Sequence, residues 1–338
     1  MKEYSDLSQT GRLRRLHALA MLALKNYDLD QQRLDYYGWY TNLLYCVTTA
    51  PGERFMLRLA APGWRELVDL RSEALWLEAL ARDTPMVVPR IVPTRSGEYV
   101  QPMNIPGIPR VWNASLMHWV PGRSLKYYLT KSNLERMGIL FAQLHLHGKV
   151  WNPPPGFTTR RFEHWLSRGE ENLIIQEHAS PTLLGLPKEQ RSLLERMHRH
   201  VEQAYAQADR CDLRIIHCDL WHENIKLHHG TLIPLDFEDT TWGFRSHDIA
   251  MAMLDLLEAT DEARYAALLA AFQRGYTTHL PWPAEPIEPF QIGRLLWKIN
   301  WFARFRPGEL LVVVEQHVPV FERYLQTGIV IQPPALVF

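Results

Sequence analysis

Residues Ile215 to Asp239 read IIHCDLWHENIKLHHGTLIPLDFED. The polar positions of interest within this stretch are His217, Asp219, Asn224 and Asp236. The pattern suits phosphoryl transfer, because Asp219 can hold an attacking hydroxyl group and accept its proton. Asn224 and Asp236 offer the hard oxygen ligands that Mg²⁺ prefers. The spacing is that of an H-x-D-x-x-x-x-N catalytic loop followed by a metal-binding aspartate.

Short apolar runs on both sides predict a strand and a hairpin around these residues. Residues 214–216 form a run that leads into the loop, and residues 231–235 form another that ends at Asp236. Residues 228–230 read His-His-Gly and predict a turn after a short strand at 225–227. We therefore expect a β-hairpin to carry both metal ligands, a context that an accidental match of the motif would lack.

A zinc site is a competing interpretation, because His217, Cys218 and His222 lie close together in the sequence. Zinc sites usually draw four nitrogen or sulfur ligands at characteristic spacings, and the sequence nearby offers no second pair of that kind. The zinc interpretation therefore fails on physical grounds. His228 and His229 are expected to be exposed turn residues.

The motif resembles that of the aminoglycoside phosphotransferase and choline kinase-like superfamily, in its branch of bacterial small-molecule kinases with the protein-kinase-like fold. The four polar residues named above match it one by one, and residues 243–250 match the Gly and the Asp-Ile-Ala that follow. The resemblance is strong over residues 215–250, weaker in the first half of the chain and almost absent in its last quarter. It implies an ATP- and Mg²⁺-dependent enzyme that phosphorylates an alcohol group of a small molecule.

The resemblance implies a loop over the nucleotide phosphates, for which residues 37–42 (YGWYTN) are the candidate. The loop holds one glycine, Gly38, and so departs from the G-x-G-x-x-G of protein kinases. Gly38 permits a tight backbone turn. The polar side chains of Thr41 and Asn42 are expected near the phosphates.

Arg58 stands where kinases place the lysine that reaches the phosphates, and Glu73 stands where they place its partner on a helix. Arginine is always charged and binds phosphate through two hydrogen bonds, so it can do this work with a different geometry. The adenine is expected at the backbone of residues 116–120, a segment that includes Met117 and Trp119.

The resemblance also suggests roles for the residues near Asp219. His217 is expected to orient the loop by hydrogen bonding and not to titrate in the reaction. Asp248 either buttresses the loop or caps the helix that begins near it. Glu238 and Asp239 either bind a cationic group of the substrate or are simply solvated.

The acceptor pocket of this fold is built mainly by the helical part. There, Trp297 and Trp301 share one face of a helix expected at 286–305, and aromatic faces stack sugars or hold ammonium groups. An amino sugar, or an amino alcohol such as homoserine or choline, is therefore expected. A Ser/Thr protein kinase remains an alternative, but only six residues separate Asp236 from Gly243, which leaves little room for an activation segment.

A nucleotide-binding pseudokinase regulator is the second alternative. The single glycine of the loop and the arginine at position 58 favour it slightly. The complete set of Asp219, Asn224 and Asp236 argues against it, because each of them is required only for transfer.

Composition narrows the classes further. Lys+Arg and Asp+Glu are both 37 in the 338 residues, so the basic excess of a nucleic-acid binder is missing. Hydrophobic residues make up 46% and charged residues 22%, which is typical of a globular protein. The three cysteines predict no disulfide framework, and the N-terminus lacks a signal core, so a cytoplasmic protein without membrane contact is expected. The sequence does not indicate an oligomeric state.

The order of elements predicts the α+β class, with a bilobal protein-kinase-like fold. Strand-rich sequence follows a first helix at 13–24 and brackets a second at 65–81. A nucleotide-binding lobe is expected over 1–120, and a catalytic and substrate-binding helical lobe over 121–338. The first helix of that second lobe is expected to start with a capping box, Ser132 to Glu135. Further helices are expected at 188–208, 247–259, 261–279, 286–305 and 308–327.

Overall fold

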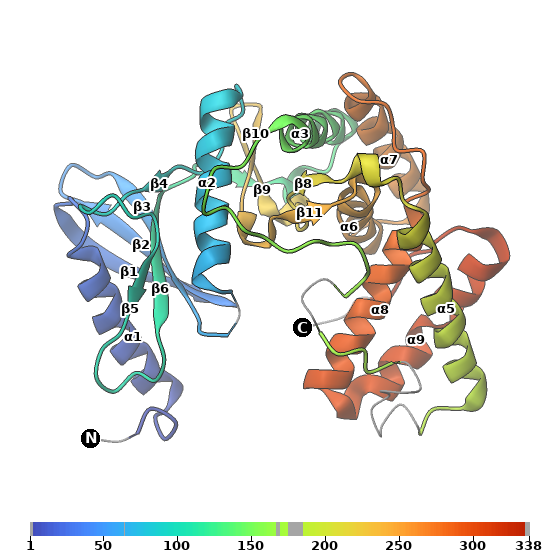
Figure 1. Cartoon of the computed structure of the whole chain (residues 1–338), viewed down its shortest axis with the longest axis horizontal. Coiled ribbons are helices and arrows are strands. Elements are labelled where there is room, and N and C mark those ends of the chain that lie inside the picture. The colour runs from blue at the N-terminus through green and yellow to red at the C-terminus, as the bar shows by residue number, and fades with distance from the viewer. Residues whose placement is uncertain (1–2, 64, 167–169, 175–184, 335–338) are drawn as a thin grey trace. The chain divides into compact units, whose positions relative to one another are not determined.

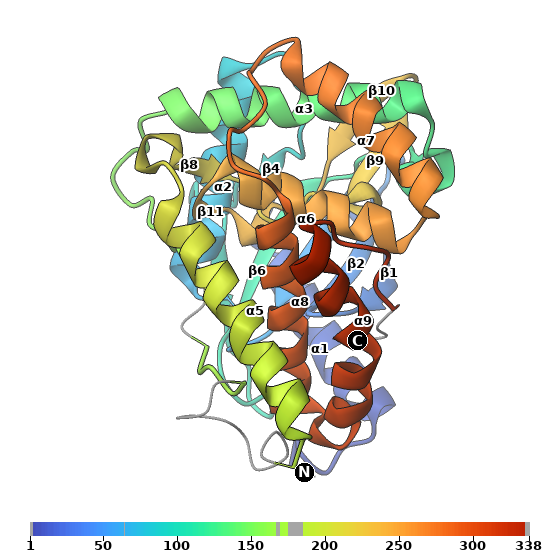
Figure 2. The ribbon, with the colours of Figure 1, turned by 90° about the vertical axis from the view of Figure 1, so that its right-hand side faces the viewer.

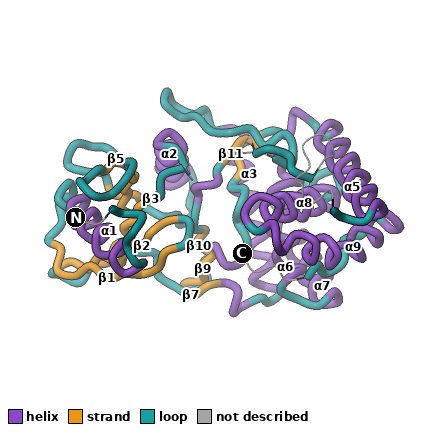
Figure 3. The backbone as a smooth tube through the Cα atoms, turned by 90° about the horizontal axis from the view of Figure 1, so that it is seen from below, coloured by secondary structure: helices purple, strands orange, loops and turns teal. Residues whose placement is uncertain are grey.

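The computed structural model describes residues 3–63, 65–166, 170–174 and 185–334. Two units can be distinguished in it. The first comprises Met1–Gly122, Asn152–Thr159 and Ile233–Glu238, and the second comprises Arg123–Trp151, Arg160–Leu232 and Asp239–Phe338. Strands gather in the first unit and helices in the second, as Figure 3 shows. The sequence predicted one boundary between the lobes, at residue 120. The first unit also contains residues 152–159 and 233–238, which lie beyond that boundary.

The first unit is built on a six-stranded antiparallel sheet with the strand order β1-β2-β3-β6-β4, in which β5 also pairs with β6 (Figure 1). The strands are β1 (Gln31–Trp39), β2 (Asn42–Thr49), β3 (Arg54–Ala60), β4 (Ile91–Val92), β5 (Gln101–Met103) and β6 (Trp112–His118). Two helices belong to the same unit, α1 (Gln9–Leu24) and α2 (Leu67–Asp83).

Alternation along β3 sends side chains to two different surroundings. Leu57 and Leu59 are fully buried in an apolar core shared with α1. Arg58 and Ala60 point to the opposite face, where Ala60 packs with Leu70 of α2. Figure 1 shows α1 and α2 on different sides of the sheet. The same alternation that builds the core therefore directs the Arg58 side chain toward α2.

Three local predictions for this unit need adjustment. The first helix begins earlier, at Gln9, because the Ser8 side chain accepts a 3.2 Å hydrogen bond from the Gly11 N–H and caps it. The second helix runs from Leu67 to Asp83 instead of 65–81. The expected phosphate loop at 37–42 is narrower, because β1 and β2 extend into it and only residues 40–41 lie outside the strands.

The second unit is mainly helical. Its described α-helices are α3 (Lys131–Val150), α5 (Lys188–Gln207), α6 (Arg245–Glu258), α7 (Glu262–Thr277), α8 (Glu288–Phe305) and α9 (Leu310–Thr327). Figure 2 shows α5, α8 and α9 side by side. A side chain at Gly138 of α3 would lie 2.0 Å from the Phe272 oxygen of α7, so glycine permits close packing of these helices. The capping box is wrong, because Thr130 caps α3 by accepting a hydrogen bond from the Asn133 N–H.

Two small sheets contain the remaining described strands. One pairs β8 (Arg214–Ile216) with β11 (Thr241–Gly243), and the other has the order β10-β9-β7, with β7 (Arg123–Ser124), β9 (Ile225–His228) and β10 (Thr231–Pro234). A side chain at Gly148 would lie 2.0 Å from the Ile215 oxygen, so α3 packs directly on the backbone of β8. This contact fixes the strand that leads into the loop of Asp219.

The two units together confirm the predicted α+β class, with strands and helices segregated. The hairpin of β9 and β10 is present as predicted, and His229 and Gly230 form its turn with positive φ angles of 46° and 82°. Within the described residues, every helix is too short or too polar to span a lipid bilayer.

Candidate active site

The loop after β8 carries the proposed base, Asp219. β8 is buried along its whole length, so the chain enters the loop from a fixed strand. His217 is 0% exposed, and its Nδ1 accepts a 3.3 Å hydrogen bond from the Asp219 backbone N–H. This contact agrees with the orienting role expected of His217. The Asp219 side chain remains 30% exposed and accessible to a substrate.

Cys218 has a left-handed backbone conformation with a φ of 70°. This conformation costs a non-glycine residue on the order of 1–3 kcal/mol and persists only where the surroundings impose it. Here the Cys218 N–H donates a 2.6 Å hydrogen bond to Oδ1 of Asp248. Asp248 therefore holds the backbone next to Asp219.

Asp248 is itself held by a buried chain of hydrogen bonds. His145 Nε2 lies 2.9 Å from Asp248 Oδ2, and His145 Nδ1 lies 2.9 Å from the Tyr276 hydroxyl. Burial lowers the pKa of His145, so its ring is neutral and donates to the carboxylate through Nε2. Burial alone would raise the pKa of Asp248, but the His145 and Cys218 hydrogen bonds bring it below its ordinary value. Of the two roles expected for Asp248, the buttress is confirmed and the cap is wrong, since Phe244 occupies the N-cap of α6.

Asn224 lies at the end of the 3₁₀-helix η3 (His222–Asn224) and faces the same loop. Its side-chain Nδ2 donates to the Asp219 backbone oxygen at 2.9 Å and to Asp219 Oδ2 at 3.1 Å. The spacing of the motif thus brings Asp219 and Asn224 into direct contact. Because the nitrogen makes both bonds, the side-chain oxygen of Asn224 is left to act as a ligand.

Asp236 follows β10 and belongs to the first unit. Its φ of 60° is left-handed, as is the φ of 70° at Cys218. Strained conformations of this kind concentrate at functional sites. Asp236 also adds to the negative charge that acts on Arg58.

Arg58 and Glu73 form a buried ion pair, as the sequence predicted. The guanidinium donates to both carboxylate oxygens, with Nη1 at 3.1 Å from Oε1 and Nη2 bonded to Oε2. Its Nε lies 3.3 Å from the Ser115 hydroxyl oxygen. Burial opposes the charge of Arg58, but the contact with Glu73 outweighs it and raises the Arg58 pKa. The guanidinium is therefore permanently charged and fixed in direction.

Glu238 belongs to this cluster and was not expected there. It is 6% exposed, accepts a 2.6 Å hydrogen bond from Asn42 Nδ2 and lies 3.8 Å from Arg58 Nη1. Its backbone oxygen accepts a 3.0 Å bond from Arg65 Nε. Glu238 is therefore not solvated, and it links the loop residue Asn42 to Arg58. Asp239, in the second unit, lies 3.9 Å from Arg160.

The remaining nucleotide residues lie at two places in the first unit. Gly38 is in β1, and Thr41 is exposed in the turn beyond it. Met117 is in β6, where it is paired with both β3 and β4. The Trp119 N–H donates a 3.0 Å bond to the Arg54 oxygen, and its ring lies 3.8 Å from the Arg54 guanidinium. The backbone and side chain of Trp119 are thus held in place.

The face of α8 that contains Trp297 holds a residue that sequence reasoning missed. Arg294 Nη2 lies 3.9 Å from Asp219 Oδ1, and its guanidinium lies 4.4 Å from the Trp297 ring centre. Trp297 Nε1 donates a 3.1 Å bond to Glu170. Trp301 packs its ring against Phe305 one turn later on the helix. The only signal for Arg294 in the sequence was its position three residues before Trp297, which puts both residues on the same face of the helix.

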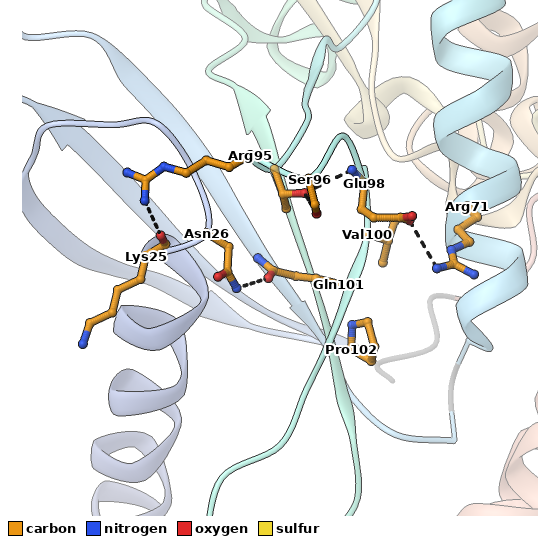
Figure 4. A pocket seen from close by; sticks show the side chains of 10 residues that line it. Lys25, Asn26, Arg71, Arg95, Ser96, Glu98, Val100, Gln101 and Pro102 are labelled. Carbon is orange, nitrogen blue, oxygen red and sulfur yellow. Dashed lines mark hydrogen bonds and ion pairs between the residues drawn. The ribbon is translucent and has the colours of Figure 1, made fainter.

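A pocket of about 360 Å³ lies elsewhere in the first unit, and Figure 4 shows its polar lining. Arg71 is paired with Glu98 at 3.2 Å, and Asn26 is hydrogen-bonded to Gln101. Arg95 donates to the Lys25 backbone oxygen at 3.2 Å. Since these polar groups already contact one another, and none of the predicted site residues lines the pocket, we assign it no part in the site.

Known proteins relate this arrangement to a family. Residues 38–284 match the model of the APH phosphotransferase enzyme family. A microcompartment-associated aminopropanol kinase is similar in structure, with a TM-score of 0.74, 20% identity and coverage of 92% of this chain and 98% of that one. An amicoumacin kinase in complex with AMP-PNP, Ca²⁺ and Ami has a TM-score of 0.75 at 18% identity, covering 97% and 98%. A spectinomycin phosphotransferase bound to ADP and spectinomycin has a TM-score of 0.61 at 12% identity, covering 92% and 93%.

No curated protein sequence matches the chain. The structural likenesses establish a protein-kinase-like fold, and the family match spans most of the chain, including both the first-unit cluster at Arg58 and the loop of Asp219. The protein therefore belongs to the APH phosphotransferase enzyme family, whose members transfer a phosphoryl group to a hydroxyl group.

Proposed function

We propose that the protein transfers the γ-phosphoryl group of ATP to a hydroxyl group of a small molecule, with Mg²⁺ as the metal. The observation that carries the proposal is the set of hydrogen bonds that His217 and Asn224 make to Asp219. Two of these bonds fix the Asp219 backbone and the third orients its carboxylate, which is 30% exposed, beside an amide oxygen that is left to bind a metal. A structural aspartate would not need both features.

In the proposed reaction, Asp219 orients the acceptor hydroxyl and takes its proton. The acceptor oxygen bonds to the γ-phosphorus while the bond from that phosphorus to the β–γ bridging oxygen breaks, which yields ADP and a phosphate ester. The proton then leaves Asp219 for solvent. Positioning and charge supply most of the rate enhancement in this chemistry, so a rigid loop is what the reaction requires.

The donor set fits Mg²⁺, which takes oxygen ligands from few protein groups and from phosphates. We assign the Asn224 amide oxygen and the Asp236 carboxylate as its protein ligands. When bound, the metal neutralises charge on the phosphates. Arg58, fixed by Glu73, is proposed to hold the α- and β-phosphates.

The turn after Gly38, with Thr41 and Asn42, is proposed to cover the phosphates, and the backbone near Met117 and Trp119 to bind adenine. Trp297 and Trp301 are proposed to border the acceptor, which we expect to be an amino sugar or an amino alcohol of the homoserine or choline type. The neighbours named for aminopropanol, amicoumacin and spectinomycin agree with a small acceptor. In the described part of the chain Cys46, Cys211 and Cys218 are thiols outside any disulfide, which supports a reducing cytoplasm.

The protein-kinase alternative is disfavoured by the segment after Asp236. The 3₁₀-helix η4 (Phe237–Asp239) and β11 occupy almost all of the residues up to Gly243, and β11 is paired with β8. Only Thr240 lies between these two elements, so an extended activation segment does not fit there. The regulator alternative is disfavoured because the loop of Asp219 keeps the hydrogen bonds that only transfer requires.

Mg²⁺-dependent release of ADP across a panel of hydroxyl compounds tests the proposal. The panel contains amino sugars, choline, ethanolamine, homoserine and hexoses, and Asp219→Asn is the control. We expect at least one acceptor to stimulate turnover in the wild type and none to do so in Asp219→Asn. Tight binding of Mg-ATP with no stimulated turnover, or stimulated turnover of equal size in both proteins, would contradict the proposal.

A further inference from the structure

His247 is a buried residue of α6 that the proposed reaction does not use. It directly precedes Asp248, which holds the Cys218 backbone, and it is 2% exposed. Both of its ring nitrogens have a polar partner, the Tyr205 hydroxyl for Nδ1 and the Cys218 sulfur for Nε2. All four residues belong to the second unit. The His247 side chain therefore joins α5, which carries Tyr205, to the catalytic loop.

The contact with Tyr205 sets the position of the proton on the His247 ring. Burial raises the pKa of Tyr205 well above its ordinary value and lowers the pKa of His247 to about 3, so the hydroxyl keeps its proton and the ring is neutral. Among the described residues the hydroxyl has one hydrogen-bond partner, His247 Nδ1 at 2.7 Å, so it donates to that nitrogen. The single proton of the ring is then on Nε2, where it faces the Cys218 sulfur at 3.7 Å.

Cys218 is thereby held at its backbone and at its side chain. Asp248 Oδ1 accepts a 2.6 Å hydrogen bond from its N–H, and His247 donates to its sulfur. Its φ of 70° persists only while contacts impose it, because the conformation is unfavourable for a residue with a side chain. The bond at the nitrogen alone leaves rotation about the Cα atom free. The second contact fixes the direction of the side chain, and with it the carbonyl group to which Asp219 is attached.

Aromatic residues from three other segments pack around the His247 ring. Its centre lies 3.9 Å from that of Phe162, 6.0 Å from that of Tyr205 and 6.4 Å from that of Phe290. Tyr205 of α5 and Phe290 of α8 also contact each other edge to face, with their centres 4.9 Å apart. This packing restricts rotation of the His247 ring. The position of Nε2 is therefore set by the helices and not by the loop that it holds.

We propose that His247, oriented by the Tyr205 hydroxyl, is a positioning residue of the phosphoryl transfer: it holds the Cys218 side chain and thereby fixes the backbone that presents Asp219. The inference rests on the proposed function, in which Asp219 is the base. His247 and Tyr205 are buried, so they act on Asp219 through Cys218 and exchange no proton with the acceptor. Their contribution belongs to kcat, which depends on the position of Asp219, and not to the KM for ATP.

Turnover of single variants is the first test. Tyr205→Phe removes only the hydroxyl, and His247→Leu replaces the ring by an apolar side chain. With the best acceptor, kcat should fall about threefold to tenfold in Tyr205→Phe and about tenfold to a hundredfold in His247→Leu, with the KM for ATP within roughly threefold. His247→Gln should recover part of the loss, because its amide can donate to the sulfur. Tyr265→Phe is the matched control, since it removes a hydroxyl that accepts a 3.4 Å bond from Gln291, and it should leave kcat unchanged.

A double-mutant cycle separates an action through Cys218 from a general loss of packing. If His247 acts through the sulfur, Cys218→Ala and His247→Leu each lower kcat, and their combination lowers it little further. Glycine adopts a positive φ without strain, so Cys218→Gly should recover part of the kcat lost in His247→Leu. Losses that multiply in the double variant, or a glycine variant without recovery, would overturn the proposal.

Amide hydrogen exchange tests the anchor without relying on turnover. The peptide containing residues 215–220 should exchange faster in His247→Leu and Tyr205→Phe than in the wild type, and at the wild-type rate in Tyr265→Phe. Unchanged exchange in the first two variants would overturn the proposal even if their kcat values fall. A wild type that is silent with every acceptor would contradict the proposed function, and the catalytic role of His247 with it, whereas the exchange rates would still decide whether His247 holds the loop.

Discussion

The loop of Asp219 and the cluster around Arg58 are both rigid, but different forces hold them. In the loop, short-range bonds from His217 and Asn224 are backed by a neutral histidine, His145, behind Asp248. In the cluster, a permanent cation is held between the buried carboxylates of Glu73 and Glu238. The difference teaches that the loop depends on histidines staying uncharged, whereas the cluster depends on charges staying paired.

The largest expected effect comes from breaking the pair in the cluster. Glu73→Gln keeps the shape but leaves Arg58 without its main counter-charge, which should lower the free energy of unfolding by about 3–5 kcal/mol. Urea unfolding measures this change. Arg71→Gln on the same helix is the control, because Arg71 pairs with Glu98 at the surface and should cost less than about 1 kcal/mol. Equal losses of the free energy of unfolding in the two variants would contradict the prediction that the buried Arg58–Glu73 pair contributes more than the surface pair.

Breaking the buttress of the loop should instead reduce catalysis. Asp248→Asn removes the charge that accepts from Cys218 and His145, so the Asp219 backbone loses its fixed position. We expect kcat to fall about tenfold to a hundredfold, since small misplacements of a catalytic group are costly. The KM for ATP should change less than threefold. A change in that KM with an unaltered kcat would contradict the positioning role of Asp248.

The predictability of the two regions follows from the same difference. Asp219 and Asn224 touch because the motif places them on one short loop, so their spacing alone revealed them. The Arg58 and Glu73 pair was readable from its place in the resemblance to the family. Glu238, by contrast, reaches Arg58 from far along the chain, and nothing in its neighbourhood in the sequence indicates burial.

The residues behind the loop were harder to foresee for a related reason. His145 and Tyr276 lie on α3 and α7, and they meet Asp248 only because these helices pack closely at glycines such as Gly138. Arg294 likewise reaches Asp219 through the packing of α8. Sequence patterns identify which residues share one helix face, but they do not show which face of another helix will meet it.

Acid should affect the second unit through its buried histidines. Burial lowers the pKa of His222 to about 4 and of His247 to about 3, and it also lowers that of His145. In the folded protein these pKa values lie below the unfolded value of 6.5, so the neutral histidines contribute fully to the free energy of unfolding above pH 6.5. This contribution is lost as the pH falls toward the folded pKa values. His222 alone should lose on the order of 2 kcal/mol between pH 6.5 and 5. Urea unfolding across this range, with His222→Gln as the less pH-dependent variant, checks the prediction, and a flat wild-type profile would contradict it.

The smallest effect is a gain of stability at Asp255, on α6. Asp255 carries a buried charge above its raised pKa of about 6, so Asp255→Asn should stabilise the protein by on the order of 1–2 kcal/mol at pH 7.5. The gain should vanish near pH 4, where the carboxyl is protonated in the folded state. Thermal unfolding at the two pH values measures it. A loss of stability at pH 7.5 would contradict the expectation that the ionised Asp255 carboxylate destabilises the fold.

The most direct test of the central claim separates nucleotide binding from transfer in Asp219→Asn. Titration with Mg-ATP gives Kd, and ADP release with the best acceptor gives kcat. We predict that Kd stays within threefold of the wild type, while kcat falls a hundredfold to ten-thousandfold, the range for a lost general base. Turnover at the wild-type rate would contradict the assignment of Asp219 as the base. If the affinity for Mg-ATP falls by the same factor as kcat, Asp219 would instead belong to nucleotide binding.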